Sequence, residues 1–298
     1  MTPPPDFKSA AEVTEILRNA ADALRSSPHR AGSVFRPPNS GRVLVTGDLH
    51  DNPDNLSRIV KLACLKSPGN HLILHEIIHS EHLVNRVDLS HRMLLRVAAL
   101  IVSYPNQVCL LLANHELAQM TGKGVSKGAG DSVALFNDGL AFAFGDGWSQ
   151  VAEATNTLIR ALPLAARSDA GLLCAHSLPG PRPGFDPAVL DRDLTDADYR
   201  WGTDVGEAGS AYLMVWGRGY SAEQVEALAS RWGVRLFCLG HVHVANGIEA
   251  RGPRVIVLNS DHEFATALPI DLAGVPTAEE AVMSAIRLRS VPSESIEH

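Results

Sequence analysis

Five short apolar runs of this sequence each end in side chains that can bind a divalent metal ion. In chain order the runs are followed by GDLH at 47–50, HE at 75–76, ANHE at 113–116, His176, and GHVH at 240–243. Carboxylates, imidazoles and amide oxygens suit ions such as Mn, Fe or Zn, and the lack of cysteine in the set argues against a structural zinc site. The pattern therefore predicts a metal centre.

Two of these motifs carry ligand types at alternate positions. Asp48 with His50, and His241 with His243, would each point to one face if the backbone were extended. A carboxylate that bridges two ions holds them about 3.5 to 4 Å apart, a geometry that polarises a phosphoryl group and generates hydroxide near neutral pH. Phosphoester chemistry is the expectation that follows.

Each motif by itself also has an ordinary structural interpretation. A lone Asp-x-His pair is common, Asn114 could cap the N-terminus of a helix, and His241 and His243 could face solvent from a strand. A single histidine after a strand is more often a hydrogen-bonded side chain than a ligand. The recurrence of all five motifs at predicted strand ends favours the metal centre.

The apolar runs are predicted strands, and they alternate with longer segments of helical periodicity. That alternation favours an α/β or α+β layered fold. Ligands of open α/β sheets gather at the carboxyl ends of strands, so one sheet edge would collect all five motifs. The predicted strands are Val43–Thr46, His71–Leu74, Val108–Leu112, Leu172–Ala175 and Leu236–Leu239, with an antiparallel hairpin at Val242–Ile248 and Val255–Leu258. The predicted helices are Ala10–Leu24, Asn55–Lys66, Ser90–Ser103, Ser132–Phe144, Ser149–Leu162 and Ala222–Trp232.

The chain divides into three predicted segments. Residues 1–40 are expected to form an N-terminal helix and a linker, residues 41–270 a catalytic domain, and residues 271–298 a C-terminal helix and tail. Gly-rich stretches at 121–130 and 202–209 predict long surface loops, which are either lids or plain connections.

Composition excludes several classes of function. The 298 residues are 45% hydrophobic and 20% charged with a formal net charge of -7, which is typical of a globular protein without a general basic surface for nucleic acid. The longest apolar stretch, Met93–Val102, is interrupted by Arg96 and is about half as long as a membrane-spanning helix. The first residues lack the features of a secretory signal. We therefore expect a cytoplasmic protein that binds neither nucleic acid nor a membrane. Cys109, Cys174 and Cys238 lie inside apolar runs, which predicts inert buried thiols.

The ordered set resembles the calcineurin-like metallophosphoesterase superfamily, whose motifs run GDxH, GDxxDRG, GNHE, a single His and GHxH. The flanking segments are closer still to the phosphoprotein serine/threonine phosphatases. YPNQVCLLLANHE at 104–116 is similar to that family's YPxxVxLLRGNHE, and LPLAA at 162–166 with CAHSLPGP at 174–181 is similar to its LPLAA and CVHGGLSP. The resemblance covers about residues 42–268. It implies a central β-sandwich of mixed sheets flanked by helices, in four layers.

The resemblance also implies two divalent metal ions, with Mn the first expectation and Fe or Zn the alternatives. The first ion would be bound by Asp48, His50 and His243, the second by Asn114, His176 and His241, and Glu76 would bridge the two. His115 would protonate the leaving alkoxide or stabilise the transition state electrostatically. Arg218 of an Arg-Gly pair would contact phosphate through its planar guanidinium, with a solvated loop charge as the alternative.

The second motif departs from the family pattern, because this chain has HEIIHSE where the family has GDxxDRG. Glu76 replaces the bridging Asp, His79 stands where an Asp would orient His115, and Ser80 replaces a phosphate-binding Arg. A longer bridging carboxylate changes the spacing of the metals, and His79 would favour a protonated His115 less than a carboxylate does. Arg86 is a candidate substitute for the missing Arg.

The resemblance implies a dinuclear enzyme that uses a metal-bound hydroxide to hydrolyse phosphate monoesters. The expected partner is a phosphorylated protein or a small phosphoester, with serine or threonine phosphate in protein as the first substrate. Two alternatives stay open. Fold and metals do not determine the substrate, so a dinucleoside polyphosphate or a phosphodiester is one alternative. The altered HEIIHSE segment motivates the other, a degenerate phosphatase that acts as a binding module.

Overall fold

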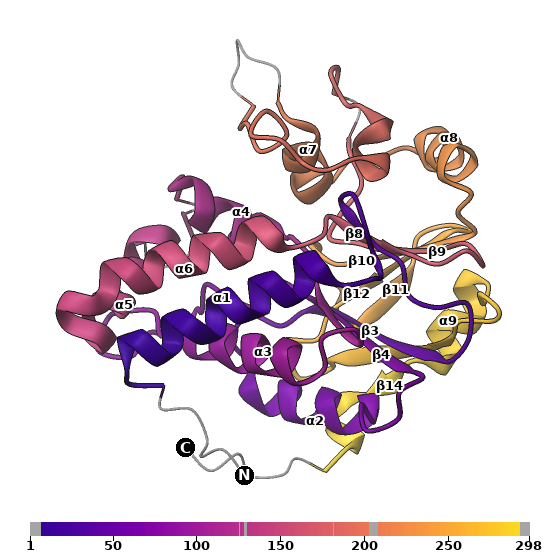
Figure 1. Ribbon diagram of the computed structural model, residues 1–298. Coiled ribbons are helices and arrows are strands. Elements are labelled where there is room, and N and C mark those ends of the chain that lie inside the picture. The colour runs from indigo at the N-terminus through magenta and orange to yellow at the C-terminus, as the bar shows by residue number, and fades with distance from the viewer. Residues whose placement is uncertain (1–6, 125, 128–129, 181, 203–207, 293–298) are drawn as a thin grey trace.

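The computed structural model describes residues 7–124, 126–127, 130–180, 182–202 and 208–292. Within these residues the chain forms two mixed β-sheets that pack face to face, with helices on their outer faces (Figure 1). The seven-stranded sheet has the order β1 (Arg30–Ala31), β2 (Val34–Phe35), β8 (Ala165–Arg167), β9 (Leu172–Ala175), β10 (Leu236–Leu239), β12 (Val255–Leu258) and β11 (Ile248–Ala250). The five-stranded sheet has the order β14 (Ile286–Arg287), β13 (Thr266–Asp271), β3 (Arg42–Asp48), β4 (Asn70–His75) and β5 (Val108–Leu110). A separate small hairpin pairs β6 (Ser126–Lys127) with β7 (Gly130–Asp131).

The helices cover the sandwich from both sides. In Figure 1, α1, α3, α5 and α6 gather on one side of the sheets while α7 and α8 lie on another, and α1 packs along α6 and α3. The α-helices are α1 (Ala10–Ser26), α2 (Pro53–Ala63), α3 (His91–Ser103), α4 (Asn114–Thr121), α5 (Ser132–Phe144), α6 (Trp148–Ala161), α7 (Ser210–Trp216), α8 (Ala222–Trp232) and α9 (Ala278–Ser284). Short 3-10 turns occupy Gly145–Gly147, Pro187–Asp191 and Leu288–Ser290. This architecture confirms the predicted fold class.

Strand periodicity explains the layers. In β3, Val43 and Val45 lie in the core between the two sheets, whereas Leu44 lies in the core that the sheets share with the helices. In β10, Cys238 faces the other sheet and Phe237 faces the helices. Successive strand side chains point to opposite faces, so a continuous apolar run is what a strand buried on both faces requires. Apolar runs ending in polar ligands were therefore reliable indicators of these strands.

The inter-sheet core also accounts for the cysteines. Cys109, Cys174 and Cys238 are fully buried there as free thiols. Burial raises the pKa of the Cys109 thiol far above its ordinary value, which keeps it protonated. The prediction of inert, packed cysteines is confirmed.

One predicted strand is wrong. Val242–Ile248 is not extended, because a turn closes there with the Gly247 N–H donating to the Val244 carbonyl, and the strand β11 begins only at Ile248. Gly247 has φ +71, a left-handed conformation that glycine adopts at little cost. The predicted antiparallel hairpin nevertheless exists in shorter form, since β11 pairs antiparallel with β12.

The terminal segments contribute more to the sheets than the pattern indicated. β1 and β2 lie in the stretch expected to be a linker, and β2 pairs parallel with β8. β13 runs antiparallel to β3 and also pairs with β14. Of the Gly-rich loop predictions, residues 125, 128–129 and 203–207 lie outside the described residues, as do 293–298 of the predicted tail. In the described part of the chain, no helix combines the length and apolar character that crossing a membrane requires.

Gly47, in the first motif, lies where β3 meets the other sheet. Its N–H donates to the Ser260 hydroxyl at 2.9 Å. A Cβ at this position would lie 2.0 Å from the carbonyl oxygen of Leu258, so the approach of the two backbones requires glycine. The contact brings the end of β3, and with it Asp48, against the other half of the sandwich.

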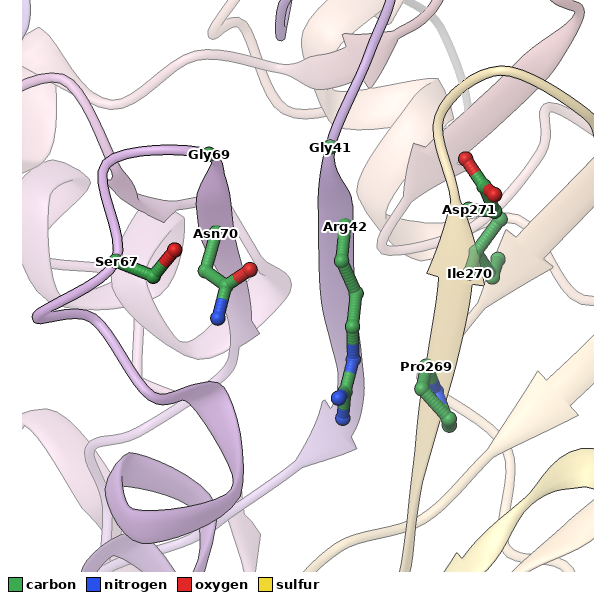
Figure 2. Close-up of a pocket in the computed structure, with 8 residues that line it drawn as sticks. All are labelled: Gly41, Arg42, Ser67, Gly69, Asn70, Pro269, Ile270 and Asp271. Atoms are coloured by element: carbon green, nitrogen blue, oxygen red, sulfur yellow. The ribbon is translucent and has the colours of Figure 1, made fainter.

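A cavity of about 460 Å³ lies at the opposite end of the same strands. Figure 2 shows it between the first residues of β3 and β4 and the last residues of β13, with Gly41, Arg42, Asn70 and Asp271 among its lining residues. The six residue steps from Arg42 to Asp48 correspond to roughly 20 Å of strand. This cavity is therefore separate from the edge that carries the metal-binding motifs.

Candidate metal centre

Two groups of potential ligands meet at one end of the sandwich. Asp48, His75 and His176 form one group, and His50, Glu76 and His115 form the other, with one ligand atom per residue within 4.8 Å of the others in each group. The ligand-bearing loops follow β3 and β4 in one sheet and β9 and β10 in the other. The motifs thus converge from two sheets, and not from the single sheet edge that the sequence predicted.

Glu76 stands between the two groups. Its Oε2 lies 3.2 Å from His50 Nε2, while its Oε1 lies 3.7 Å from His176 Nε2 and 3.9 Å from His115 Nε2. Oε1 also accepts a hydrogen bond from the His115 backbone N–H at 3.2 Å. One carboxylate therefore faces imidazoles of both groups, with Oε2 toward His50 and Oε1 toward both His115 and His176.

The side chain of Asn114 contacts the imidazoles of His176 and His241. Its Oδ1 lies 2.6 Å from His176 Nε2 and 2.9 Å from His241 Nδ1, and these two ring nitrogens are 3.1 Å apart. Asn114 is the first residue of α4 and its side chain does not cap the helix, because Ala113 occupies the N-cap position. The helix-cap interpretation of this residue is therefore wrong, and its amide oxygen is directed at the histidines.

The alternating motifs are not extended, contrary to the expectation from their spacing. His50 has φ +38 and His241 has φ +68, and Glu76 and His79 are also in the left-handed region. Such conformations cost of order 1 kcal/mol or more in non-glycine residues and cluster at functional sites. Sharp turns after the strands, and not strand faces, are what aim these side chains inward.

Asp48 of the first motif, GDLH, is hydrogen-bonded to the backbone of the last motif, GHVH. Both carboxylate oxygens accept the His241 backbone N–H, at 3.0 and 2.9 Å, and Oδ1 lies 3.5 Å from His176 Nδ1. Burial, and then the nearby Glu76 carboxylate, raises the pKa of Asp48 well above its ordinary value. Two buried carboxylates this close to one another favour a bound cation.

Burial holds three of the imidazoles around these carboxylates neutral. Burial lowers the pKa of His75 to about 4 and that of His241 to about 4, and it lowers the pKa of His176 well below its ordinary value. Neutral imidazole carries the lone pair that binds a metal ion. Nδ1 of His176, Nε2 of His241 and both ring nitrogens of His75 have no hydrogen-bond partner among the described residues. Orphaned buried nitrogens beside two carboxylates fit divalent cations.

His115 is connected to a chain of polar side chains. Its Nδ1 lies 2.8 Å from His79 Nδ1, whose ring Nε2 lies 3.0 Å from Gln119 Oε1. Gln119 in turn donates from Nε2 to Asn137 Oδ1 at 2.9 Å. His79 therefore contacts His115 as the sequence comparison anticipated, while the interaction of Gln119 with His79 had no signal in the motif pattern.

Glu116 holds the loop that carries His79. It is fully buried, and its Oε1 accepts the backbone N–H groups of Ile77 at 2.9 Å and Ile78 at 3.4 Å. Burial, and next the charge of Glu76, raises the pKa of Glu116 to about 7. The last residue of the NHE motif thus positions the variant HEIIHSE segment.

Arg218 lies beside the centre at the edge of a second cavity, of about 420 Å³. The cavity lies near His241, because the ring of Trp216 in its wall is 6.0 Å from the His241 ring, and the positive charge of Arg218 adds to the burial that lowers the pKa of His241. Its lining residues are Gly180, Arg182, Tyr212, Leu213, Trp216, Gly217, Arg218 and Gly219. The two arginines and the aromatic rings give the cavity both an anion-binding and an apolar character.

Two of the residues that the sequence singled out are exposed, and a third, Ser80, is buried directly after His79. His243 is exposed, and its ring packs against His262 at 5.0 Å between centroids. Arg86 is exposed in a turn. The Ser80 backbone N–H donates to Asp88. The roles of His243 and Arg86 at the site therefore stay predictions.

Comparisons with known proteins agree with this geometry. The family model described as calcineurin-like phosphoesterase matches residues 41–245. Sequence comparison with curated proteins finds no match. Among solved structures, a protein serine/threonine phosphatase from Saccharomyces cerevisiae, with similarity to human phosphatase PP5, superimposes with a TM-score of 0.66 at 15% identity, covering 97% of this chain and 91% of that chain. A cold-active protein-tyrosine phosphatase of a psychrophilic Shewanella species superimposes with a TM-score of 0.55 at 14% identity, covering 86% and 84%. The fold is that of phosphatases of this kind, and the chain belongs to the calcineurin-like phosphoesterase family.

Proposed function

We propose that this protein hydrolyses phosphate monoesters at two divalent metal ions, with phosphorylated serine or threonine in protein as its substrate class. The observation that carries the proposal is the position of Glu76, whose Oε2 lies 3.2 Å from His50 and whose Oε1 lies 3.7 Å from His176. Two ions flanking one carboxylate supply Lewis-acid polarisation of the phosphoryl group and an activated water. The residues that would hold them are Asp48 and His50 for one ion and Asn114, His176 and His241 for the other, bridged by Glu76. His243, which is exposed in this structure, is a further predicted ligand of the first ion. The family pattern alone makes manganese the first ion to test, and the cytoplasm is the expected location.

His115 is the proposed general acid. The Gln119 amide donates to Asn137, so its oxygen accepts from His79 Nε2–H, and neutral His79 then accepts the Nδ1–H of His115 through its own Nδ1. When the His115 ring is doubly protonated, its Nε2, which faces Glu76, carries the transferable proton. A proton there can pass to the leaving alkoxide as the ester bond breaks.

Arg218 and Arg182 are proposed to bind the phosphate group or its nearest neighbour in the substrate. Both line the cavity that adjoins His241. A guanidinium offers paired N–H donors that match two phosphate oxygens. They would take the place of the arginine that the HEIIHSE segment lacks.

Arg218→Ala tests this assignment. Removing a charged, bidentate hydrogen-bond donor costs about 1.5 to 3 kcal/mol, so we expect kcat/KM for a phosphate monoester to fall about 10- to 100-fold with metal content unchanged. Arg254→Ala is the matched control, because Arg254 pairs with Glu226 on an exposed surface away from the cavity. Equal kinetics for Arg218→Ala and Arg254→Ala would show that Arg218 does not bind the phosphate group.

A second candidate substrate, tyrosine phosphate, is favoured by the aromatic lining of the cavity. Trp201, Tyr212 and Trp216 form a cluster with ring centroids 5.2 to 6.2 Å apart. Aromatic side chains pack well against another ring. This lining offers a phenolic leaving group more contact than a serine or threonine side chain.

A substrate panel separates these possibilities. We expect kcat/KM to be highest for monoesters, at least about 10-fold above bis(p-nitrophenyl) phosphate and a dinucleoside tetraphosphate. A difference of about 1.4 kcal/mol in transition-state binding between two substrates changes the ratio of their kcat/KM values tenfold. Matched peptides phosphorylated on serine, threonine or tyrosine then rank the monoesters. A preference for the diester or the anhydride would replace the monoester proposal, and a tyrosine preference would select the second candidate.

A further inference from the structure

His75 is a buried histidine that the family motif does not explain. It ends β4, directly opposite Asp48 in the pairing of β3 with β4, and its side chain is 0% exposed. The corresponding position of the GDxxDRG motif is glycine, so an imidazole here is a property of this chain. Both of its ring nitrogens lack a hydrogen-bond partner among the described residues.

The ring of His75 is directed at the metal centre. One of its nitrogens lies within 4.8 Å of ligand atoms of both Asp48 and His176. Gly240 supports this placement independently, because a Cβ there would lie 2.2 Å from Asp48 Oδ1 and 3.4 Å from His75 Nδ1. The carboxylate and the imidazole therefore border the same small volume beside the Gly240 backbone.

Burial by itself does not distinguish His75, since the chain has another buried histidine. His91 is 3% exposed, its Nδ1 also has no partner among the described residues, and its ring packs against Phe136 and Phe144. The neighbours of His91 are aromatic, whereas those of His75 are a carboxylate and a second imidazole. A buried polar group without a partner costs about 1 to 3 kcal/mol, and a cation beside Asp48 would offset that cost only for His75.

We propose that His75 is an additional ligand of the metal centre, binding a divalent ion beside Asp48 and His176. The inference rests on the proposed dinuclear site and extends it. One more imidazole shifts the donor set from oxygen toward nitrogen, which favours zinc or ferrous iron over manganese. The chain then differs from the family pattern in metal preference as well as in the bridging carboxylate.

Calorimetric titration of the metal-free full-length protein tests the proposal, with Zn²⁺ alone and Mn²⁺ alone as the probes. Loss of a residue that merely orients a ligand weakens metal binding 10- to 100-fold, so we expect His75→Gln to raise the Kd for Zn²⁺ by about 100-fold or more. The Kd for Mn²⁺ should rise less, by about 10-fold. His91→Gln is the matched control and should leave both values within about threefold. A wild-type Kd for Zn²⁺ in His75→Gln overturns the inference.

Two further measurements keep the test decisive. Circular dichroism reports whether each variant folds, and His75→Gly, which restores the residue of the family motif, serves if His75→Gln does not. In wild-type protein labelled with ¹⁵N-histidine and loaded with ¹¹³Cd²⁺, the ring nitrogen of His75 should show splitting by the metal, and an unsplit signal overturns the inference without any variant.

Asp48→Asn distinguishes failure of the His75 inference from failure of the proposed dinuclear centre. If it weakens Zn²⁺ binding while His75→Gln does not, only the His75 inference fails, and if neither weakens it, the proposed centre fails.

Discussion

Asp48→Asn is expected to remove metal-dependent turnover, lowering kcat/KM for a phosphate monoester by about 10³-fold or more. The amide oxygen of Asn can still accept the His241 backbone N–H that Asp48 accepts at 2.9 and 3.0 Å, so the turn between the two motifs is retained. The substitution removes the negative charge that balances the ions. Steady-state kinetics together with the metal content of the variant measure the effect.

His241→Ala provides a companion variant that removes a ligand without touching the charge. The imidazole of His241 shares the Asn114 oxygen with His176, so its loss opens one side of the ligand set proposed for the second ion. We expect metal content and turnover to fall together in both variants. Wild-type turnover with unchanged metal content in either would show that these residues do not form the centre.

His115→Asn is the prediction with the next largest effect, a fall in kcat of about 10²- to 10³-fold with both metals retained. The backbone N–H of His115 still reaches Glu76 in the variant, so the carboxylate keeps that hydrogen bond. The variant lacks the proton at Nε2 that, in the proposed mechanism, passes to the leaving alkoxide. The effect should be smaller for p-nitrophenyl phosphate than for an alkyl ester, because a good leaving group requires less protonation.

Metal analysis decides between two roles for His115, since one of its ring nitrogens lies within 4.8 Å of ligand atoms of His50 and Glu76. Retained metal with reduced kcat identifies the general acid, whereas loss of metal identifies a ligand. His82→Asn is the matched control, because His82 is an exposed histidine in the same neighbourhood of the chain. Its kinetics should equal those of the wild type.

Much of the fold could be predicted because the strands are buried on both faces. Val43–Val45 and Leu236–Leu239 are apolar without interruption, and a ligand-type residue follows each within three positions. Strands that lack such a run escaped detection. β1, β2 and β14 are only two residues long, and β13 contains Pro269. Their place in the sheets depends on pairing with distant partners, which a local pattern does not encode.

The site was predictable in its residue types and less so in its geometry. The convergence of Asp48, Glu76, Asn114, His176 and His241 follows from the order of the motifs, and these five lie together in the structure. The left-handed turns at His50 and His241 could not be predicted, because tertiary contacts stabilise conformations that those residues disfavour locally.

Two other features of the site had a weak signal or none. His75 follows an apolar run directly, but its position is glycine in the family motif, so the resemblance offered no role for it. The aromatic cavity forms only when α7 packs beside the turn that carries His241, as the contact of Trp216 with His241 shows. Residues brought together by such packing, including Arg182 and Tyr212, are recognisable only in three dimensions.

The most direct test of the dinuclear centre is the metal content of the purified protein, measured beside p-nitrophenyl phosphate hydrolysis with and without added manganese. We expect two equivalents of divalent metal per chain and turnover that depends on them. Bound metal without turnover on this monoester would move the function to a diester, an anhydride or a binding module. A protein that binds no divalent metal under any loading condition would contradict the central claim.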